Sequence, residues 1–427
     1  MGYSQQDTTK LPFAIADEKK LSAEDLKNKK EGFYVAGVPD ISVDPLNGLG
    51  VGVEGSLFFN GKKSDPFFAY VPYKARLNVV LFYTTKQQRE LILNFDVPYI
   101  FQTKWRFRAE AAFEVNPNLL FFGNTEKTLQ PLSYYPNNDT SKTLVNNASY
   151  NDYNNSLTGS KKYFNTYQEQ EIVANFSFEH SFLRGKLRTL LGYEFATVSN
   201  TTPLNDSSLL HQSALSGKIL GYGNNLISFI HSALIFDTRD LEADPSKGIF
   251  AEITNELSLT ALGSQYNFNK TFAHFNIYQR ILPSAFKKFV FAGRIAIGYA
   301  QGDVPFYEYR HQWSSDTHVE GLGGSNTIRG YKQARFLARV MQFTNLELRY
   351  RFAQCKLSKQ HLAFSAVPFF DVGGVWDNLT NLNHLENIRY SEGLGLRIAW
   401  NVNTVLRFDY SVSREDAQFF FQLGHVF

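Results

Sequence analysis

Apolar and polar residues alternate with a period of two through most of this chain. In the segment FTNLELRYRF (343–352), leucine, tyrosine and phenylalanine occupy alternate positions, and asparagine, glutamate and arginine fill the positions between them. Successive side chains of an extended strand point to opposite faces, so this alternation predicts strands with one apolar and one polar face. Sixteen such segments can be counted: 33–43, 49–60, 73–85, 88–99, 103–116, 168–182, 186–199, 226–238, 247–261, 270–281, 287–300, 340–352, 361–375, 390–400, 404–413 and 417–427.

The length and charge of these segments favour a membrane barrel over a soluble sandwich. Many run to about ten residues or more, the length that a tilted strand needs to cross a bilayer, whereas strands of globular proteins usually have about 5–6 residues. Their polar faces carry several charges each, which suits a water-filled lumen. The sequence therefore predicts an all-β fold, a transmembrane antiparallel β-barrel of about 16 strands.

The connections between the predicted strands give a separate check on the count. Bacterial barrels alternate short periplasmic turns with longer external loops. All of the longest connections follow odd-numbered strands: 117–167, 200–225, 301–339 and 376–389. These four are therefore expected at the external end of the barrel, with both termini in the periplasm.

Two regions are expected from this organisation. Residues 1–32 are polar, and a capping box beginning at Ser22 would open a short helix, so this segment is expected in the periplasm or inside the pore. Residues 33–427 are expected to form the outer-membrane β-barrel. The first strand contains Gly37 and Pro39, so it should make few hydrogen bonds to the closing strand.

Composition narrows the class further. Aromatic residues make up 15% of the chain, yet the mean hydropathy is −0.28. No run approaches the ~18 apolar residues of a membrane helix. A net charge of +3 gives no case for nucleic acid as a partner, and a single cysteine, Cys355, can form neither an internal disulfide nor a thiolate metal cluster.

Several motifs then occur in a specific order. The stretch LIFDTRDLEADPSKG (234–248) is followed by GGSNTIRGY (323–331), NLELRYRF (345–352) and PFFDVGGVWD (368–377). This series resembles the bacterial surface antigen (BamA-type) superfamily of outer-membrane assembly factors. The resemblance covers roughly 226–427 by motif and the earlier strands by pattern only.

The resemblance implies a role for the loop that contains Arg329. In these barrels the sixth external loop folds back into the lumen, and its arginine pairs with acidic residues of the wall. The matching wall positions are Glu347 and Asp371, and the alternation independently places both on inward faces. A guanidinium in a confined lumen loses solvation unless carboxylates hold its planar fork. The complete set of lumen residues singled out is Ile328, Arg329, Gly330, Tyr331, Glu347 and Asp371.

Two further groups of residues belong to the same resemblance. A periplasmic turn ordered by local side-chain to backbone bonds is predicted from Asp237, Arg239, Asp240, Asp244, Pro245 and Gly248. A closing strand that ends in an aromatic residue resembles the recognition signal of outer-membrane barrels, with a lipid-facing set of Phe419, Phe421, Leu423 and Phe427. Trp376 and Tyr390 are candidates for the interfacial aromatic belt.

Family members typically carry polypeptide-transport-associated (POTRA) domains before the barrel, and none is expected from this sequence. The chain thus resembles a short branch that lacks them, so client handling does not transfer with the barrel. The resemblance implies protein insertion or transport in the outer membrane of a Gram-negative-type bacterium. A weak seam could act as a lateral gate, opening sideways to pair with a client strand. Expected partners are outer-membrane lipid, client outer-membrane proteins and periplasmic or outer-membrane complex subunits.

Other functions stay open at this point. A passive or plugged pore, or a structural scaffold for envelope proteins, fits the same barrel. No Gly-x-Ser-x-Gly elbow, phosphate loop or His-Glu-x-x-His motif is present, so neither an enzyme nor a cofactor is expected. A set of potential metal ligands lies in one polar loop, where such residues are common, and no metal is predicted for it: Glu308, His311, Asp316, His318 and Glu320.

Overall fold

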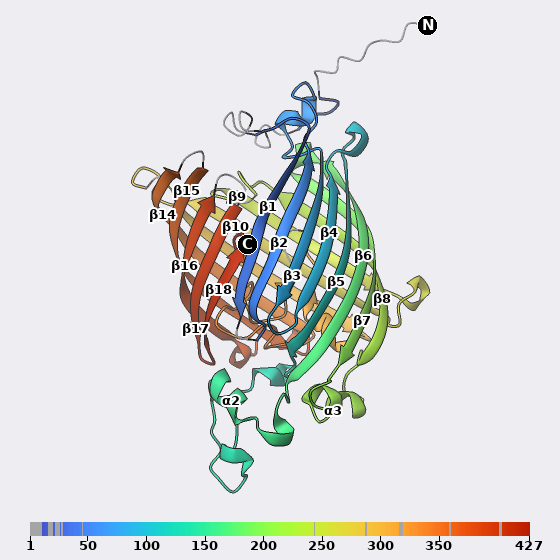
Figure 1. Cartoon of the computed structure of the whole chain (residues 1–427), viewed down its shortest axis with the longest axis vertical. Coiled ribbons are helices and arrows are strands. Elements are labelled where there is room, and N and C mark those ends of the chain that lie inside the picture. Colours follow the sequence, from blue (N-terminus) through green and yellow to red (C-terminus); the bar gives the residue numbers. More distant parts are fainter. Residues whose placement is uncertain are drawn as a thin grey trace.

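A computed structural model describes residues 11–15, 20–21, 26, 29–44, 46–242, 244–286, 288–315, 319–357, 360–400 and 404–427. One sixteen-stranded antiparallel sheet dominates it and curls around a central lumen (Figure 1). Each strand pairs with its neighbours in chain order: β1 (Phe33–Asp44), β2 (Gly48–Phe59), β3 (Ala75–Thr84), β4 (Arg89–Val97), β5 (Trp105–Leu120), β6 (Thr166–Phe182), β7 (Leu187–Thr201), β8 (Gly223–Asp237), β9 (Gly248–Ser258), β10 (Phe268–Arg280), β11 (Phe289–Gly302), β14 (Val340–Leu357), β15 (Gln360–Trp376), β16 (Arg389–Trp400), β17 (Thr404–Ser413) and β18 (Ala417–Leu423).

The predicted fold class is confirmed, and each of the sixteen predicted segments overlaps one of these strands. Boundaries differ by a few residues, because alternation does not show where pairing stops. For example, β5 continues to Leu120, beyond the predicted end at 116. A further hairpin of two very short strands, β12 (His311–Gln312) and β13 (Val319–Glu320), lies within the connection from β11 to β14.

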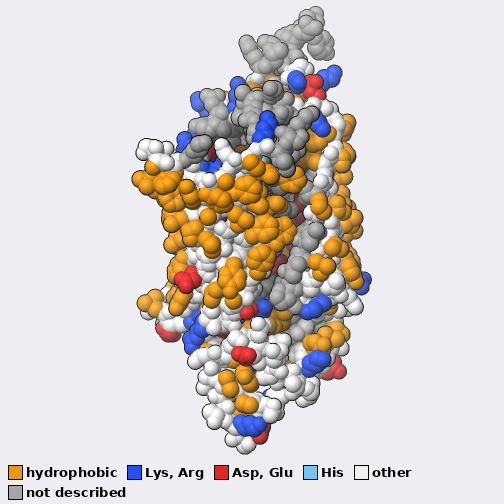
Figure 2. Space-filling view, turned by 60° about the vertical axis from the view of Figure 1, so that its left-hand side comes forward, with side chains coloured by type: hydrophobic (Ala, Val, Ile, Leu, Met, Phe, Trp, Pro, Cys, Tyr) orange, Lys and Arg blue, Asp and Glu red, His pale blue; other side chains and the backbone are white. Residues whose placement is uncertain are grey.

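The two faces of the sheet follow the alternation. On β14, Leu346 and Leu348 are exposed on the outside, whereas Glu347 and Arg349 are buried on the inside. The outer face carries a broad band of hydrophobic side chains between ends where charged residues gather (Figure 2). Apolar residues outside and ion pairs inside form the arrangement that a bilayer around a polar lumen requires.

The long connections gather at one end of the barrel. Helices α2 (Tyr150–Ser156) and α3 (Leu209–Leu215) both lie there, and the described residues that precede β1 lie at the opposite end (Figure 1). Among the described residues, no helix is long and apolar enough to span a membrane. Tyr390 is exposed, as a belt residue would be, but Trp376 is only 1% exposed, so its assignment to the belt was wrong.

The described part of the N-terminal segment packs on the short turns at its end of the barrel. Ile15 is buried against Phe67 and Val71 of the β2–β3 connection. Lys29 donates from Nζ to the Phe68 and Val71 carbonyls at 2.7 and 2.6 Å. The helix expected to start at Ser22 lies outside the described residues, and the domain boundary at residue 32 stays a prediction.

The sheet has one seam. β1 and β18 lie side by side (Figure 1), but no ladder of hydrogen bonds joins them in the part of the chain that the structure describes. β18 ends at Leu423, and Gly424 then turns with a φ of +82°, a conformation that glycine adopts without strain. The final residues leave the sheet and enter the lumen, which shortens the edge that β18 presents to β1.

Candidate functional site in the lumen

The connection between β11 and β14, residues 303–339, folds back into the barrel and is called the lumen loop here. Ile328 and Phe336 are completely buried, and they pack with Phe343 of β14 and Phe272 of β10. A bridge between Leu322 and Phe336 and the β12–β13 hairpin give the loop its own backbone bonds. The loop is therefore a packed element of the lumen and not a surface connection.

Arg329 lies at the centre of this packing, with no exposed surface. Its Nε and Nη2 donate to the two carboxylate oxygens of Asp371 at 2.7 and 2.8 Å, and its backbone N–H donates to the same carboxylate at 3.1 Å. Its Nη1 donates to Glu347 and to Asp409, each at 3.0 Å. The ring of Phe369 lies 3.4 Å from the guanidinium carbon. Three carboxylates and one aromatic face thus fix the arginine in a single orientation.

Further arginines surround the same carboxylates. Arg397 donates to Asp409 at 2.5 Å and to Glu347 at 3.2 Å, and Arg349 donates to Glu347 at 2.8 Å. The arginine cluster, as we call it, contains five arginines and three carboxylates, all buried: Arg294, Arg329, Arg349, Arg397, Arg407, Glu347, Asp371 and Asp409. Such a network is costly to desolvate, and removing one member leaves uncompensated charge.

The structure brings together the three charged lumen residues identified from sequence, Arg329, Glu347 and Asp371. Asp409 was missed, although it lies on the polar face of the predicted strand 404–413 and that face was visible in the sequence. Alternation shows which residues point inward, but it does not show which of them the tip of a distant loop will reach.

Gly330 lets the loop approach the barrel wall closely. Its φ is +94°, and a Cβ at this position would lie 3.0 Å from Ser411 Oγ and 3.1 Å from the backbone N of Ser413. The Ser413 hydroxyl donates to the Gly330 carbonyl at 2.7 Å. Tyr331 is buried beside Phe336. In the Ile-Arg-Gly-Tyr motif, the isoleucine and the tyrosine therefore anchor the loop by packing, and the arginine binds the wall carboxylates. The glycine allows the backbone to approach the wall closely.

The turn between β8 and β9 is ordered by its aspartates. Asp237 accepts from the backbone N–H and the side chain of Arg239, whose guanidinium lies over the ring of Phe250. Asp240 accepts from the backbone N–H groups of Ser246 and Lys247 at 2.8 and 3.2 Å. Burial alone would raise the pKa of Asp240, but the bonds from Ser246 and Lys247 hold it below its usual value.

Asp244 and Gly248 show two further constraints on this turn. Asp244 accepts from Lys288 Nζ at 2.6 Å and Arg351 Nη2 at 2.9 Å, and His425 Nε2 lies 3.2 Å from its other oxygen. Against the opposing effect of burial, these partners keep the pKa of Asp244 well below its usual range. Gly248 has a φ of +107°, and a Cβ there would lie 2.3 Å from the Thr238 carbonyl. Asp244 therefore joins distant segments, which sequence reasoning did not anticipate.

The closing strand differs from its prediction at its end. Phe419 is exposed on the outer face, and the ring of Phe421 stacks on Phe408 at 4.8 Å, as a lipid-facing set requires. The side chain of Leu423 is outside the described part of the structure. Phe427 was wrongly placed on the lipid face, because it is 7% exposed and lies inside the lumen, with Arg294 and Arg349 over its ring at 5.0 and 5.2 Å.

The candidate metal ligands do not converge in the described part of the loop. Glu308 Oε2 accepts from Lys270 at 2.5 Å, and His311 pairs with Glu320 across the β12–β13 hairpin. Asp316 and His318 lie outside the described residues. Among the residues that are described, no group of three His, Cys, Asp or Glu could hold a metal ion.

Ser314 of the lumen loop lies near His274 of β10, with Ser314 Oγ 3.4 Å from His274 Nε2, but their acid does not lie where a catalytic triad has it. Ser314 Oγ donates to Glu252 Oε2 at 2.6 Å, and His274 Nε2 lies 3.1 Å from the same oxygen. A general base must take the serine proton, with the acid on the other ring nitrogen. Here the carboxylate lies between the two groups, an arrangement that ties the loop to β9 and β10.

Fold and lumen together define a class: an outer-membrane β-barrel with an external loop anchored inside it by an arginine. A family model described as the Omp85 superfamily domain matches residues 73–427, and one described as a domain of unknown function, DUF5982, matches residues 11–74. The chain belongs to the Omp85 superfamily, and it is an outer-membrane protein of the Gram-negative type.

Individual relatives agree with this assignment. The outer membrane protein assembly factor BamA of Nitratidesulfovibrio vulgaris is 28% identical over 186 residues, which cover 41% of this chain and 22% of that protein. The crystal structure of BamA from Haemophilus ducreyi lacking POTRA domains 1–3 matches with a TM-score of 0.56 at 12% identity, covering 93% of this chain and 70% of that one. CdiB from Escherichia coli matches with a TM-score of 0.54 at 10% identity, covering 91% and 62%. These two structural matches support the fold alone.

Proposed function

We propose that this barrel acts in outer-membrane biogenesis by inserting or translocating client proteins, alone or as a subunit of a larger complex. The observation that carries the proposal is the seam, where two neighbouring strands lie side by side without a ladder. In lipid, unpaired backbone groups are costly, so such a seam is the easiest place for the barrel to open. An opened edge can add a client strand by backbone pairing.

Local sequence supports a weak seam on both sides. Pro39 in the middle of β1 has no N–H to donate, and Gly37 contributes no side-chain cover. On the other side, β18 loses its final residues to the lumen after Gly424. The lumen loop is held by its own contacts, so it does not have to move when the seam opens. No catalytic step is part of this proposal.

A disulfide across the seam tests the mechanism. Cys355 is exposed, so it must first be replaced by Ser. Val35→Cys with Gln422→Cys is a starting pair, and neighbouring registers should be tried as well. We expect the oxidised barrel to migrate as folded protein but to lose client insertion or support of growth, and a reductant should restore the activity. Full activity of the locked barrel would reject lateral opening.

The second candidate is a passive pore, either open or plugged by the packed lumen loop. Planar-bilayer conductance separates the two. The insertion proposal expects little steady current from the intact chain, because the loop fills part of the lumen. A large steady current that persists unchanged after deletion of 321–336 would favour a passive pore. The scaffold alternative would be favoured if envelope proteins co-purify with the locked and the free barrel equally and activity is the same in both.

A further inference from the structure

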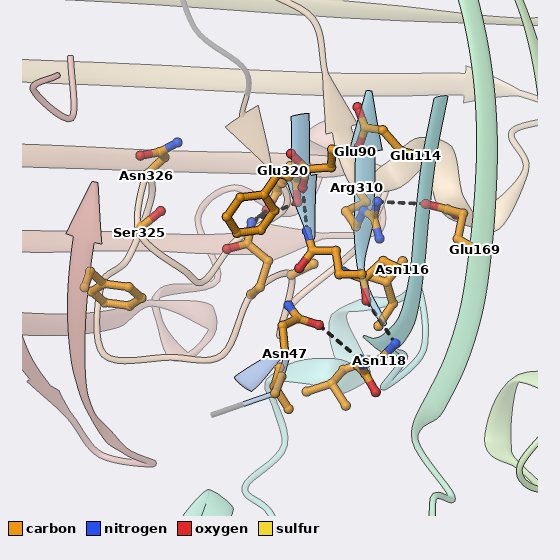
Figure 3. Close-up of a pocket in the computed structure, with 18 of the residues that line it drawn as sticks. Asn47, Glu90, Glu114, Asn116, Asn118, Glu169, Arg310, Glu320, Ser325 and Asn326 are labelled. Carbon is orange, nitrogen blue, oxygen red and sulfur yellow. Dashed lines mark hydrogen bonds and ion pairs between the residues drawn. The ribbon is translucent and has the colours of Figure 1, made fainter. Parts of the chain in front are cut away.

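A cavity of about 470 Å³ remains in the lumen beside the lumen loop. It lies between that loop, the inner side of β18 and the wall formed by β3 to β6 (Figure 3). None of the resemblances above assigns a role to it. Its lining is strongly acidic, with five glutamates and two arginines: Glu90, Glu114, Glu169, Glu171, Glu320, Arg89 and Arg310.

Three of these glutamates form a row across adjacent strands. Glu90 of β4 is directly opposite Glu114 of β5, and Glu114 is directly opposite Glu171 of β6. Directly opposed side chains have Cβ atoms only about 4.5–5.5 Å apart, and like charges in such pairs destabilise a sheet. A barrel wall gains nothing in stability from this row, so its presence needs another explanation.

Two glutamates of the row, Glu114 and Glu171, have no counter-ion within 4.0 Å among the described residues. Gln88 donates to Glu90 at 2.5 Å. Glu114 and Glu171 have neither a hydrogen bond nor an ion pair with any residue that the structure describes. Other lumen carboxylates have close basic partners: Glu347 is held by arginine and Glu308 by lysine at 3.0 Å or less. Glu114 and Glu171 differ from these two carboxylates.

Glu169 gives a second and separate indication of a missing partner. It lines the cavity and is only 4% exposed, with Oε1 2.8 Å from Arg310 Nη2 (Figure 3). Its other oxygen, Oε2, is buried and accepts no hydrogen bond within the described part of the chain. Buried carboxylate oxygens are nearly always bonded to a donor, so this atom has acceptor capacity to spare.

We propose that this cavity binds an organic cation, through an ammonium or guanidinium group placed against Glu114 and Glu171. The negative charge of the row matches the positive charge of such a ligand, and a cavity of about 470 Å³ can hold an extended molecule. A bare metal ion fits less well, because no three potential ligands converge among the described residues. The remaining lining is rich in amides, which can bond an extended chain: Asn47, Asn116, Asn118, Asn326, Gln333 and Gln418.

Two sources could supply this cation: a basic side chain of a polypeptide inside the lumen, or a free polyamine. Binding to purified wild-type barrel in detergent distinguishes them, with spermidine as one probe and an extended lysine-containing peptide as the other. A peptide with glutamate in place of lysine is the probe control. The measurement does not depend on the proposed insertion activity, so failure of one leaves the other standing.

The variant for this test is the double replacement Glu114→Gln with Glu171→Gln. It keeps side-chain shape and removes two charges, so affinity for the bound probe should fall about tenfold or more. The matched control is Glu110→Gln, on the same strand and the same face as Glu114 but outside the cavity lining, and it should change affinity little. Because the opposed charges repel, the double variant should also melt at the same or a higher temperature than wild type.

Each outcome of the binding test either supports or overturns the proposal. Binding of spermidine alone supports a small-cation site, and binding of the lysine peptide supports a site for basic polypeptide. No binding of either probe to wild type overturns the proposal. An equal loss of affinity in Glu110→Gln also overturns it, because that result would reflect the overall lumen charge. A lower melting temperature of the double variant overturns it too, since the glutamates would then have structural partners.

Discussion

Replacing Arg329 by Ala should release the lumen loop while leaving the barrel folded. Four side-chain hydrogen bonds to three carboxylates are lost in one step, together with the contact to the Phe369 ring. The backbone N–H bond to Asp371 is lost as well when the loop moves away. The sixteen-strand ladder needs none of these bonds. The change therefore acts on the loop and spares the sheet.

The magnitude depends on what each carboxylate keeps. Glu347 retains Arg349 and Arg397, and Asp409 retains Arg397. Once the loop has moved, Asp371 keeps, among its partners in the described part of the chain, the side chain of Asn345 at 2.7 Å, so it becomes the uncompensated buried charge. Breaking a buried pair in this way costs about 3–5 kcal/mol. We expect the lower end, because losing one of five arginines also relieves repulsion within the arginine cluster.

Limited proteolysis of intact outer membranes measures the effect. When a loop opens and closes faster than it is cut, the cleavage rate follows the population of the open form. A loss of about 3 kcal/mol should raise cleavage within 303–339 by about two orders of magnitude. Arg339→Ala is the matched control, because this arginine is in the same loop and its side-chain hydrogen bonds within the described residues go to the Gly302 carbonyl, at 3.4 Å, and not to the arginine cluster.

A double variant tests whether charge is the cause. In Arg329→Gln with Asp371→Asn, the orphaned carboxylate becomes a neutral amide, so a large part of the loop's protection should return. Equal cleavage of Arg329→Ala and wild type would refute the anchoring role of the arginine. Protection that fails to return in the double variant would refute the explanation by buried charge.

Three further predictions concern other parts of the chain. Gly330→Ala should speed the same cleavage, because φ is +94° and the new Cβ would lie 3.0 Å from Ser411 Oγ. An unchanged cleavage rate would contradict the close approach. Asp244→Ala should lower the urea midpoint of the barrel, since it leaves three basic side chains without their carboxylate; an unchanged midpoint would argue against the joining role. Deleting 1–32 should preserve heat-modifiable migration on a gel but lower the melting temperature, because apolar cover over the β2–β3 connection is lost; loss of that migration would mean the segment is part of the fold.

The strands and their faces were predictable because a barrel wall is a repeating local pattern. Every inward residue of the arginine cluster on β14 to β17 stands on the polar face that alternation assigns. Alternation does not show how deep in the lumen a side chain lies or which distant segment will contact it. Asp409 was overlooked because nothing in TVLRFDYSVS shows that a loop about eighty residues away reaches it.

The end of the chain shows a local pattern overruled by tertiary contacts. Phe419, Phe421, Leu423 and Phe427 fall on one face of an extended chain, so a strand to the last residue was the natural prediction. The chain instead turns at Gly424, and Phe427 is buried between the guanidinium groups of Arg294 and Arg349. The N-terminal segment shows tertiary contacts where the sequence predicted none. It was judged polar, but three of its apolar residues pack on the β2–β3 connection: Leu11, Phe13 and Ile15.

The arginine cluster and the seam are not independent, because they share side chains. Arg349 donates to Glu347 at 2.8 Å and also to the Phe427 backbone oxygen at 3.1 Å. Arg294 donates to Asn345 Oδ1 at 3.0 Å and to the Val426 carbonyl at 3.2 Å. The same two guanidinium groups therefore hold both the wall partners of the lumen loop and the residues that leave β18.

This sharing predicts a response at the seam to a change in the loop. Arg329→Ala removes one of the three arginines that bond Glu347, so Arg349 can move closer to that carboxylate, and its hold on the Phe427 oxygen should weaken. The segment after Gly424 would then be freer to return to the line of β18 and pair with β1. Cross-linking between Val35→Cys and Gln422→Cys should accordingly become faster in the Arg329→Ala background than in the parent pair. The Arg339→Ala background should leave the rate unchanged. If both backgrounds cross-link at the parental rate, the position of the lumen loop does not affect the seam. The shared arginines then serve only the stability of the barrel.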